Sequence, residues 1–197
     1  MKTTKTTKTD LPVMVFENKE AWETWLSEHF DESAGLWLRI AKKSAGAQSV
    51  SYHEALEVAL CYGWIDGQKE RFDQRFWMQK FTPRGPTSIW SKLNRAKALE
   101  LIDQGRMQPA GLTAIENAKE NGRWSTAYDS HRTAVAPDDF LKALEKNPEA
   151  RAFFARLSSQ NRYAILFRIQ TAKKIETRQK RILRFVEMLA KHKTLYP

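Results

Sequence analysis

The sequence has little of what marks a secreted, membrane-spanning or disulfide-bonded protein. Its 197 residues include a single cysteine, Cys61, so no disulfide can form within the chain. It has no run of about 18 apolar residues, which a membrane-spanning helix requires, and no apolar amino-terminal segment of the kind found in secretory signals. We therefore expect a cytoplasmic protein without a transmembrane segment.

The signatures of common catalytic and cofactor sites are also missing. The four histidines, at positions 29, 53, 131 and 192, are too far apart to form a helical metal pair, and Cys61 has no thiol partner. There is no Walker-type phosphate loop, no dinucleotide-binding glycine pattern and no Gly-x-Ser-x-Gly turn. The sequence therefore predicts no metal site and no cofactor. Cys61 falls on the inward stripe of a predicted helix and is expected to be a buried apolar residue.

Acidic residues are scarce in the carboxy-terminal part of the chain. Only 2 of the 23 Asp and Glu residues lie after position 150, whereas 12 of the 33 Lys and Arg residues do, so this part carries the whole net charge of +10. Such asymmetry indicates an anionic partner, with nucleic acid, phosphate-bearing ligands and anionic membrane as candidates, and an acidic protein or a nucleic acid is the expected partner of residues 151–193. Solvated basic helices without a partner give the same pattern. The predicted basic surface comprises Lys173, Lys174, Arg178, Arg181 and Arg184.

What the chain does contain is typical of a folded globular protein, with 42% apolar and 28% charged residues. Residues 1–10 repeat Lys-Thr-Thr and are expected to form a disordered basic tail, because they have too little apolar surface to bury. Residues 11–122 mix strand-like and helical patterns, and residues 137–197 are helical throughout, with 123–136 as the predicted connector. The predicted fold class is α+β, a small antiparallel or mixed sheet packed with helices, followed by an all-α carboxy-terminal helical unit.

Hydrophobic periodicity and capping residues locate the individual elements. Asn18 and Ser51 each precede a helical pattern, and Glu54 completes a capping box with Ser51. A hairpin is expected between residues 64 and 82, followed by a helix that begins at Thr87 or Ser88. The predicted strands are 13–16, 36–42, 64–71 and 75–82. Further helices are expected to begin at Pro109 and at Pro137, and the second of these is expected to break and restart at Asn147-Pro148. The last two predicted helices cover residues 159–171 and 173–191.

Polar and aromatic residues concentrate where the hairpin is expected to meet the next helix. The first backbone N–H groups of a helix attract anions, and Arg84, just before the predicted start, could contact the same phosphate or carboxylate with two hydrogen bonds. Tryptophans could wall such a pocket, and the other side chains could supply its polar contacts. The sequence therefore predicts a ligand site formed by Trp64, Asp66, Lys69, Trp77, Arg84, Thr87, Ser88, Trp90 and Asn94.

A purely structural interpretation accounts for the same residues. Thr87 or Ser88 would then only cap the helix, and the tryptophans would belong to the core. The two interpretations differ in whether Asp66, Arg84 and the helix start converge on one cavity. If they do, the alternative function is an enzyme acting on a phosphorylated or carboxylated small molecule, with Arg84 as an anion clamp and Asp66 as acid or base.

Two stretches near the carboxy terminus resemble a bacterial protein family. They are Pro137-Asp138-Asp139-Phe140 with Asn147-Pro148-Glu149-Ala150, and the segment from Ala172 to Ile182. The combination is similar to the carboxy-terminal signature of the bacteriocin-protection, YdeI/OmpD-associated family. Segments in the amino-terminal part also resemble this family, namely Tyr62 to Gly67, Phe81 to Arg84 with Pro86 and Ser88, Trp90-Ser91 with Asn94, and Gly105 to Met107 with Pro109 to Gly111.

The resemblance implies a small bacterial protein linked to resistance against antimicrobial peptides and to the cell envelope, and it supplies no catalytic residues. Direct capture of cationic peptides conflicts with the net charge of +10, which would repel them. The leading expectation is a non-enzymatic stress-protection protein that binds a small anion or an acidic partner. The alternatives are the enzyme described above and a non-specific nucleic-acid-binding accessory protein.

Overall fold

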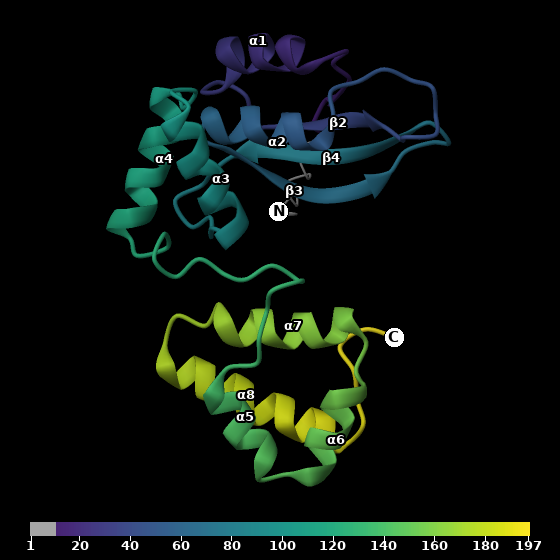
Figure 1. Cartoon of the computed structure of the whole chain (residues 1–197), viewed down its shortest axis with the longest axis vertical. Coiled ribbons are helices and arrows are strands. Elements are labelled where there is room, and N and C mark those ends of the chain that lie inside the picture. The colour runs from purple at the N-terminus through teal and green to yellow at the C-terminus, as the bar shows by residue number, and fades with distance from the viewer. Residues whose placement is uncertain (1–10) are drawn as a thin grey trace, which may run out of the picture. The chain divides into compact units, whose positions relative to one another are not determined.

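The computed structural model describes residues 11–197, which form two compact units (Figure 1). The first unit comprises residues 11–88 and 94–124, and the second comprises residues 89–93 and 125–197. The tail expected at residues 1–10 lies outside the described residues. The α+β fold class is confirmed, because one unit contains a sheet with helices and the other contains helices alone.

The first unit is built on a four-stranded mixed sheet with the strand order β1-β2-β4-β3. β1 (Val13–Met14) is parallel to β2 (Leu36–Ala41), and β4 (Phe76–Pro83) is antiparallel to both β2 and β3 (Trp64–Arg71). Side chains along β2 alternate between buried and half-buried, because every second residue points into the core. The predicted strands all form, although β1 is shorter than the predicted span 13–16.

Helices α1 (Lys19–His29) and α2 (Tyr52–Cys61) cover one face of this sheet (Figure 1). Asn18 caps α1 by accepting a hydrogen bond from the Ala21 N–H group (2.9 Å), and Ser51 and Glu54 form the predicted capping box of α2. The core of the first unit lies between these helices and the sheet, and it includes Trp22, Leu26, Leu36, Leu38, Ala55, Val58, Trp64 and Phe81.

The ladder between β3 and β4 is interrupted by a bulge, where the pairing register shifts between Asp66 and Lys69. The amide of Gln79, which is 4% exposed, satisfies the backbone that the bulge leaves unpaired. Its Nε2 donates to the carbonyls of Gly67 (3.0 Å) and Gln68 (3.2 Å). The buried polar side chain of Gln79 is therefore hydrogen-bonded.

Helix α3 (Lys92–Asp103) begins later than the sequence predicts, and the predicted start at Thr87 or Ser88 is wrong. Pro86 instead favours a turn, which the Ser88 N–H group closes by donating to the Gly85 carbonyl (3.0 Å). Ser91 then forms a parallel bridge with Tyr128, which keeps the segment before α3 extended. Tyr128 is remote in the sequence, so a local pattern could not indicate this pairing.

Helix α4 (Pro109–Glu120) begins at the predicted proline, whose missing N–H costs nothing at the first helical position. It packs against the end of α2: the Gln108 N–H group donates to the Cys61 carbonyl (3.2 Å), and Gly111 is buried beside the same carbonyl. The absence of a side chain at Gly111 permits this close approach of two backbones.

The second unit consists of α5 (Asp138–Glu145), α6 (Pro148–Arg156), α7 (Ser159–Gln170) and α8 (Ile175–Ala190). Asn147 caps α6 through a hydrogen bond from the Ala150 N–H group (3.0 Å), which confirms the predicted break before Pro148. The helices enclose a core that includes Phe140, Leu144, Phe154, Ile165, Ile169, Ile182, Phe185 and Leu189. None of the helices described in residues 11–197 is long and apolar enough to cross a membrane.

Candidate functional site

The ligand site predicted between Trp64 and Asn94 is not assembled as expected. Trp64 is fully buried in the core of the first unit, where its Nε1 donates to the Phe30 carbonyl (2.9 Å). Trp90 belongs to the short segment that clusters with the second unit. Both indoles thus have the structural environment that the alternative interpretation assigned to them.

Part of the predicted constellation does come together, on the sheet face that α2 covers. The hydroxyl of Tyr52, in the first turn of α2, donates to the Asp66 carboxylate (2.9 Å), and the Tyr52 ring lies 6.0 Å from the Trp77 ring. The Lys69 ammonium lies 4.0 Å from the centre of the Trp77 ring, a cation–π contact. Asp66, Lys69 and Trp77 are therefore linked through Tyr52, which the sequence analysis did not single out.

The predicted anion site required a helix that begins at Thr87 or Ser88, and no helix begins there. The Ser88 N–H group is used within a turn, Thr87 is exposed in that turn, and Asn94 lies in the first turn of α3. The backbone N–H group of Arg84 donates to the Gly63 carbonyl (3.0 Å), and two nitrogens of its guanidinium are shielded from solvent. The enzyme alternative required Asp66, Arg84 and a helix start at Thr87 or Ser88 to converge, and that helix start does not exist.

Two residues of the predicted basic surface, Arg178 and Arg181, have structural contacts. Arg178 forms a bidentate ion pair with the Asp139 carboxylate (2.6 and 2.8 Å) and donates to the Ile169 carbonyl (3.1 Å). Arg181 donates to the Arg168 carbonyl. Both carbonyls are in the last turn of α7, so α8 caps the carboxy-terminal end of α7 with two guanidinium groups.

The ion pair with Arg178 changes the pKa of the Asp139 carboxyl. The hydrogen bonds from Arg178 are the largest influence, and together with the charge of Arg178 and the Phe140 N–H group they outweigh partial burial and lower the pKa of Asp139 below its ordinary value. Three members of the predicted basic surface remain exposed, namely Lys173, Lys174 and Arg184.

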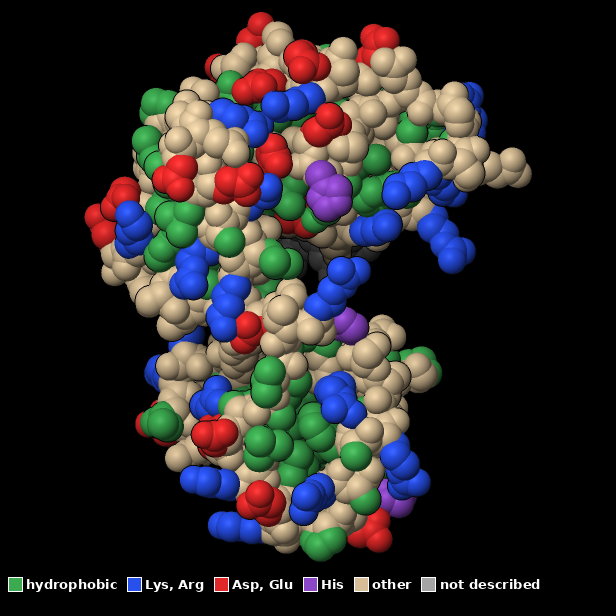
Figure 2. Space-filling view, in the orientation of Figure 1, with side chains coloured by type: hydrophobic (Ala, Val, Ile, Leu, Met, Phe, Trp, Pro, Cys, Tyr) green, Lys and Arg blue, Asp and Glu red, His purple; other side chains and the backbone are tan. Residues whose placement is uncertain are grey.

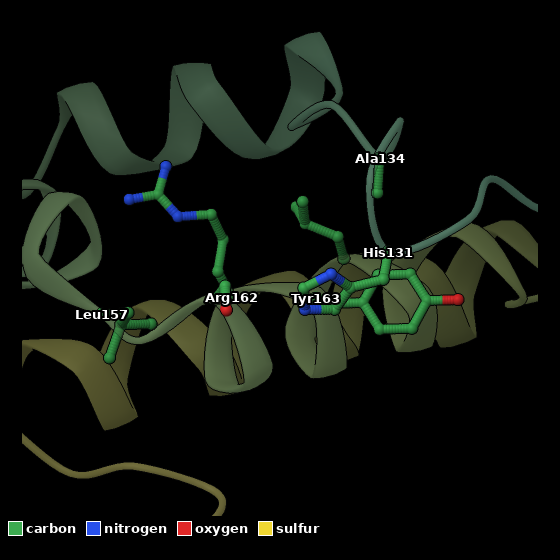
Figure 3. Close-up of a pocket in the computed structure, with 7 residues that line it drawn as sticks. His131, Ala134, Leu157, Arg162 and Tyr163 are labelled. Atoms are coloured by element: carbon green, nitrogen blue, oxygen red, sulfur yellow. The ribbon is translucent and has the colours of Figure 1, made fainter. Parts of the chain in front are cut away.

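A pocket of about 270 Å³ opens in the second unit beside Tyr163 (Figure 3). Arg162 and Tyr163 project into this region from α7, while His131 comes from the loop before α5, with its imidazole beside the Tyr163 ring (5.2 Å between ring centres). The Arg162 Nη2 donates to the Ala155 carbonyl (2.9 Å), which holds the guanidinium near the pocket. The pocket is lined by His131, Ala134, Leu157, Ser159, Arg162, Tyr163 and Leu166.

A second pocket, of about 360 Å³, lies beside the first and shares His131 and Tyr163 with it. Its other lining residues are Gln160, Ala164, Phe167, Arg168 and Tyr196. Neither pocket has an aspartate or glutamate among its described lining residues, whereas each has an arginine. The two pockets therefore combine apolar walls with positive charge, an environment suited to a small anion.

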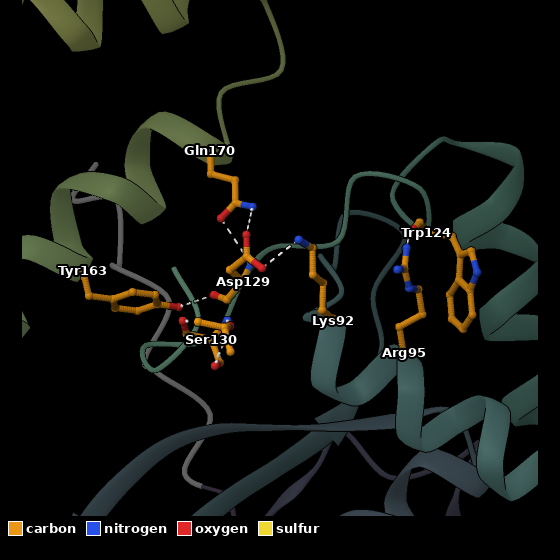
Figure 4. Close-up of polar contacts among 8 residues, drawn as sticks. Lys92, Arg95, Trp124, Asp129, Ser130, Tyr163 and Gln170 are labelled. Carbon is orange, nitrogen blue, oxygen red and sulfur yellow. Dashed lines mark hydrogen bonds and ion pairs between the residues drawn. The ribbon is translucent and has the colours of Figure 1, made fainter. Parts of the chain in front are cut away.

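The loop that carries His131 is held to α7 by Asp129 (Figure 4). The Asp129 carboxylate pairs with Lys92 (2.7 Å) and accepts a hydrogen bond from the Gln170 amide (2.7 Å), and its backbone carbonyl accepts one from the Tyr163 hydroxyl (3.1 Å). Burial raises the pKa of Asp129, but the Lys92 and Gln170 contacts outweigh it and lower that pKa. Burial, with the charges of Tyr128 and Asp129, raises the pKa of Tyr163.

The sequence analysis did not predict this pocket. The sequence signal that could have indicated it is a pair of aromatic residues at helical spacing, Tyr163 and Phe167, with an arginine beside each. His131 comes next to Tyr163 only through the tertiary fold. Within the described residues, no group of three or more His, Cys, Asp or Glu side chains is placed to hold a metal ion.

Comparison with protein families divides the chain into two matched regions. Residues 14–114 match the model described as "Domain of unknown function (DUF8412)", and residues 133–192 match the model described as "Bacteriocin-protection, YdeI or OmpD-Associated". The second match confirms the resemblance of the carboxy-terminal motifs, whereas the amino-terminal motifs fall in a different family model. No curated protein and no solved structure matches the chain.

The motifs behind these matches have structural roles. In the second unit, the Asp139–Arg178 ion pair joins the two carboxy-terminal stretches, and Asn147 caps α6. In the first unit, Arg106 pairs with Glu57 of α2 (3.0 Å) while Gly111 lets α4 approach α2. The motif residues thus make contacts that hold each region together. The pocket beside Tyr163 lies mainly within the second matched region.

Proposed function

The chain belongs to the DUF8412 family, whose model matches residues 14–114, and its residues 133–192 match the bacteriocin-protection, YdeI- or OmpD-associated model; on that premise we propose that it protects bacteria by binding a small anion, without catalysis. The observation that supports this proposal is the pocket beside Tyr163, with Arg162 and His131 in its lining and no carboxylate among its described lining residues.

The size and chemistry of the pocket favour a small amphipathic anion. Its volume of about 270 Å³ is slightly below the range that ligand pockets occupy, roughly 300–1,000 Å³, which favours a small ligand. Leu157 and Leu166 supply an apolar wall, and the Arg162 guanidinium supplies a positive charge, with N–H groups other than those of Nη2 left to donate to a carboxylate. An aromatic or branched carboxylate fits this combination better than a bare inorganic ion does.

An indirect route to protection follows from charge. Many antimicrobial peptides are cationic, and a chain with a net charge of +10 repels them at distances within about 10 Å at moderate salt. The pocket has the same sign of charge. We therefore propose that the ligand is an anionic metabolite or signal and that resistance follows from its binding.

A survival assay tests the protective function. Bacteria sensitive to a cationic bacteriocin are challenged with and without expression of the chain, and expression is expected to raise survival. Arg162→Gln and His131→Ala should each abolish this gain, while Lys174→Gln, an exposed residue outside the pocket lining, should retain it. No gain with the wild-type chain contradicts the protective function, and full protection by both pocket variants contradicts the role of the pocket.

Two variants are needed because Arg162 also holds the end of α6 through the Ala155 carbonyl, whereas His131 is exposed. Binding is measured directly by titrating the full chain with sodium benzoate and, separately, with inorganic phosphate. Benzoate at 100 times its dissociation constant should stabilise the fold by about 2.7 kcal/mol, and this gain should be lost in His131→Ala. If neither benzoate nor phosphate raises the stability of the folded chain, the pocket does not bind anions.

A further inference from the structure

The end of the sheet at the β3–β4 turn gathers basic residues that are far apart in the sequence. Figure 2 shows Lys and Arg side chains on the right-hand side of the first unit, where Figure 1 places this turn. The residues come from β2 and the segment just after it, from the last position of β3, and from the turn, and they are Arg39, Lys42, Lys43, Arg71 and Arg75. We call this set the basic hairpin tip.

The fold brings these residues together through backbone pairing. The Lys42 N–H group donates to the Arg75 carbonyl (2.8 Å), so the end of β2 lies beside the turn. The Lys42 ammonium donates to the Asp73 carbonyl (2.7 Å). The Asp73 carboxylate accepts hydrogen bonds from the N–H groups of Arg75 and Phe76 (both 2.7 Å), which closes the turn. The one acid at the centre of the tip is thus engaged in shaping the turn.

None of the five cations is ion-paired with a carboxylate in the described part of the chain. Arg39 is the most constrained of them: its guanidinium carbon lies 4.7 Å from the centre of the Phe72 ring and 4.6 Å from the centre of the Phe76 ring. Its Nε is buried without a hydrogen-bond partner among the described residues. Two rings therefore hold a guanidinium in place without neutralising it, which leaves its charge available to an anion.

Phe72 adds an aromatic surface to this charge. Its ring is 45% exposed, whereas Phe76 is 8% exposed. Between residues 16 and 88 of the described chain, Phe72 is the single large apolar side chain classed as exposed. One ring resting on a guanidinium is too small an apolar surface to insert into a membrane, but it is sufficient to stack with one base.

We propose that the basic hairpin tip binds single-stranded nucleic acid, with Arg39, Lys42, Lys43, Arg71 and Arg75 contacting phosphates and one base stacking on Phe72. Affinity for such a ligand comes from phosphate contacts and from base–aromatic stacking, and it carries little sequence preference. The site is in the first unit, so it is independent of the anion pocket beside Tyr163. It also differs from the nucleic-acid surface expected in residues 151–193.

Fluorescence anisotropy with the full chain and a labelled 15-nucleotide oligo-dT tests the proposal between 50 and 200 mM NaCl. Each phosphate contact to a single strand contributes about 0.7 to the slope of log affinity against log salt. The double variant Arg71→Gln/Arg75→Gln should therefore lower the magnitude of that slope by about 1.4. The matched double variant Lys174→Gln/Arg184→Gln removes the same charge from the second unit and should leave the slope unchanged.

A third variant separates stacking from charge. Phe72→Leu keeps an apolar side chain but removes the ring, and it should weaken binding roughly tenfold without changing the salt slope. Arg162→Gln should bind oligo-dT as the wild type does, so failure of the anion pocket cannot be mistaken for failure of this site. Equal circular dichroism spectra and melting temperatures are the check that each variant is folded.

Several outcomes would overturn the proposal. The first is that the chain does not bind oligo-dT at 50 mM NaCl. The second is that the Lys174→Gln/Arg184→Gln control lowers the salt slope as much as Arg71→Gln/Arg75→Gln does. The third is that Phe72→Leu does not weaken oligo-dT binding. Binding to vesicles of phosphatidylcholine and phosphatidylglycerol in place of oligo-dT would assign the tip to an anionic membrane instead.

Discussion

Gly111 shows how a single residue decides whether α4 can pack on α2. A Cβ atom at this position would lie 2.8 Å from the Leu60 carbonyl oxygen and would also meet the Cys61 carbonyl oxygen. Both are backbone atoms, which cannot move without distorting α2. The glycine is therefore required by packing, although it reduces the intrinsic stability of the helix that contains it.

We predict that Gly111→Ala destabilises the first unit by about 1–3 kcal/mol, because overpacking outweighs the better helix propensity of alanine. The matched control is Gly85→Ala, whose Cβ would meet no atom within 4 Å, and its effect should be within about 0.5 kcal/mol. Urea unfolding followed by tryptophan fluorescence measures both. A Gly111→Ala variant as stable as the wild type would contradict the close approach of α2 and α4.

Cys61 is the other residue whose environment makes a sharp prediction. It is 1% exposed, as the sequence indicated, and burial raises the pKa of its thiol to about 11. At pH 8 the folded protein therefore has roughly a hundredfold smaller thiolate fraction than a thiol with a pKa near 9. We predict no reaction of the native chain with a thiol-specific disulfide reagent over a period in which the urea-unfolded chain reacts completely. Rapid modification of the native chain would show that Cys61 is accessible.

At the scale of elements, two arginines of α8 add polar contacts with α5 and α7 to the apolar core that these helices share. Arg178 joins α5 through Asp139, and Arg178 and Arg181 cap α7 through its last carbonyls. Two members of the predicted basic surface, Arg178 and Arg181, therefore make contacts within the second unit. They also make the stability of the second unit depend on pH.

We predict that Asp139→Asn destabilises the second unit at pH 7 and does so less at pH 2. The folded-state pKa of Asp139 lies below its ordinary value near 3.8, so the ion pair stabilises the fold above pH 4 and is lost as the pH falls through the folded-state pKa. The carboxylate is 47% exposed, so solvent screening limits the loss to below about 1 kcal/mol. The control is Asp138→Asn, which removes a carboxylate from the same first turn.

Urea midpoints from far-ultraviolet circular dichroism at pH 7 and pH 2 give the measurement. Asp139→Asn should lower the midpoint at pH 7 by more than Asp138→Asn does, and the difference should be smaller at pH 2. An equal difference at both pH values would mean that the Asp139 charge does not contribute.

At the scale of the whole molecule, the chain passes between its two units more than once. Residues 89–93 cluster with the second unit although residues 94–124 return to the first. The connector predicted at residues 123–136 includes Arg132, which is exposed and lies outside the helices. A protease that requires an unfolded substrate should reach this site before it reaches the helices.

We predict that brief trypsin digestion cuts after Arg132 and releases a fragment of residues 133–197, detectable by mass spectrometry. Arg132→Gln should remove this fragment and leave other early cuts unchanged. Early cleavage within α5 to α8, without a cut at Arg132, would contradict the predicted connector.

Local features of the sequence determined most of the secondary structure and the family resemblance of the carboxy-terminal region. The caps at Asn18 and Ser51 and the helix restart at Asn147-Pro148 were predicted correctly, because such signals depend only on residues three or four positions away. The hairpin, the position of Cys61 and the carboxy-terminal family signature are local patterns of the same kind. The α+β class followed from them.

Only the tertiary structure decided where α3 begins, which arginines remain available, and where cations meet aromatic rings. Tyr128 holds Ser91 in an extended segment, Asp139 engages Arg178, and the approach of β2 to the β3–β4 turn places Arg39 between Phe72 and Phe76. Each contact joins residues tens of positions apart, and it forms only once strand register and helix packing are fixed. The same distance separates His131 from Tyr163, which is why neither proposed binding site could be read from neighbouring residues alone.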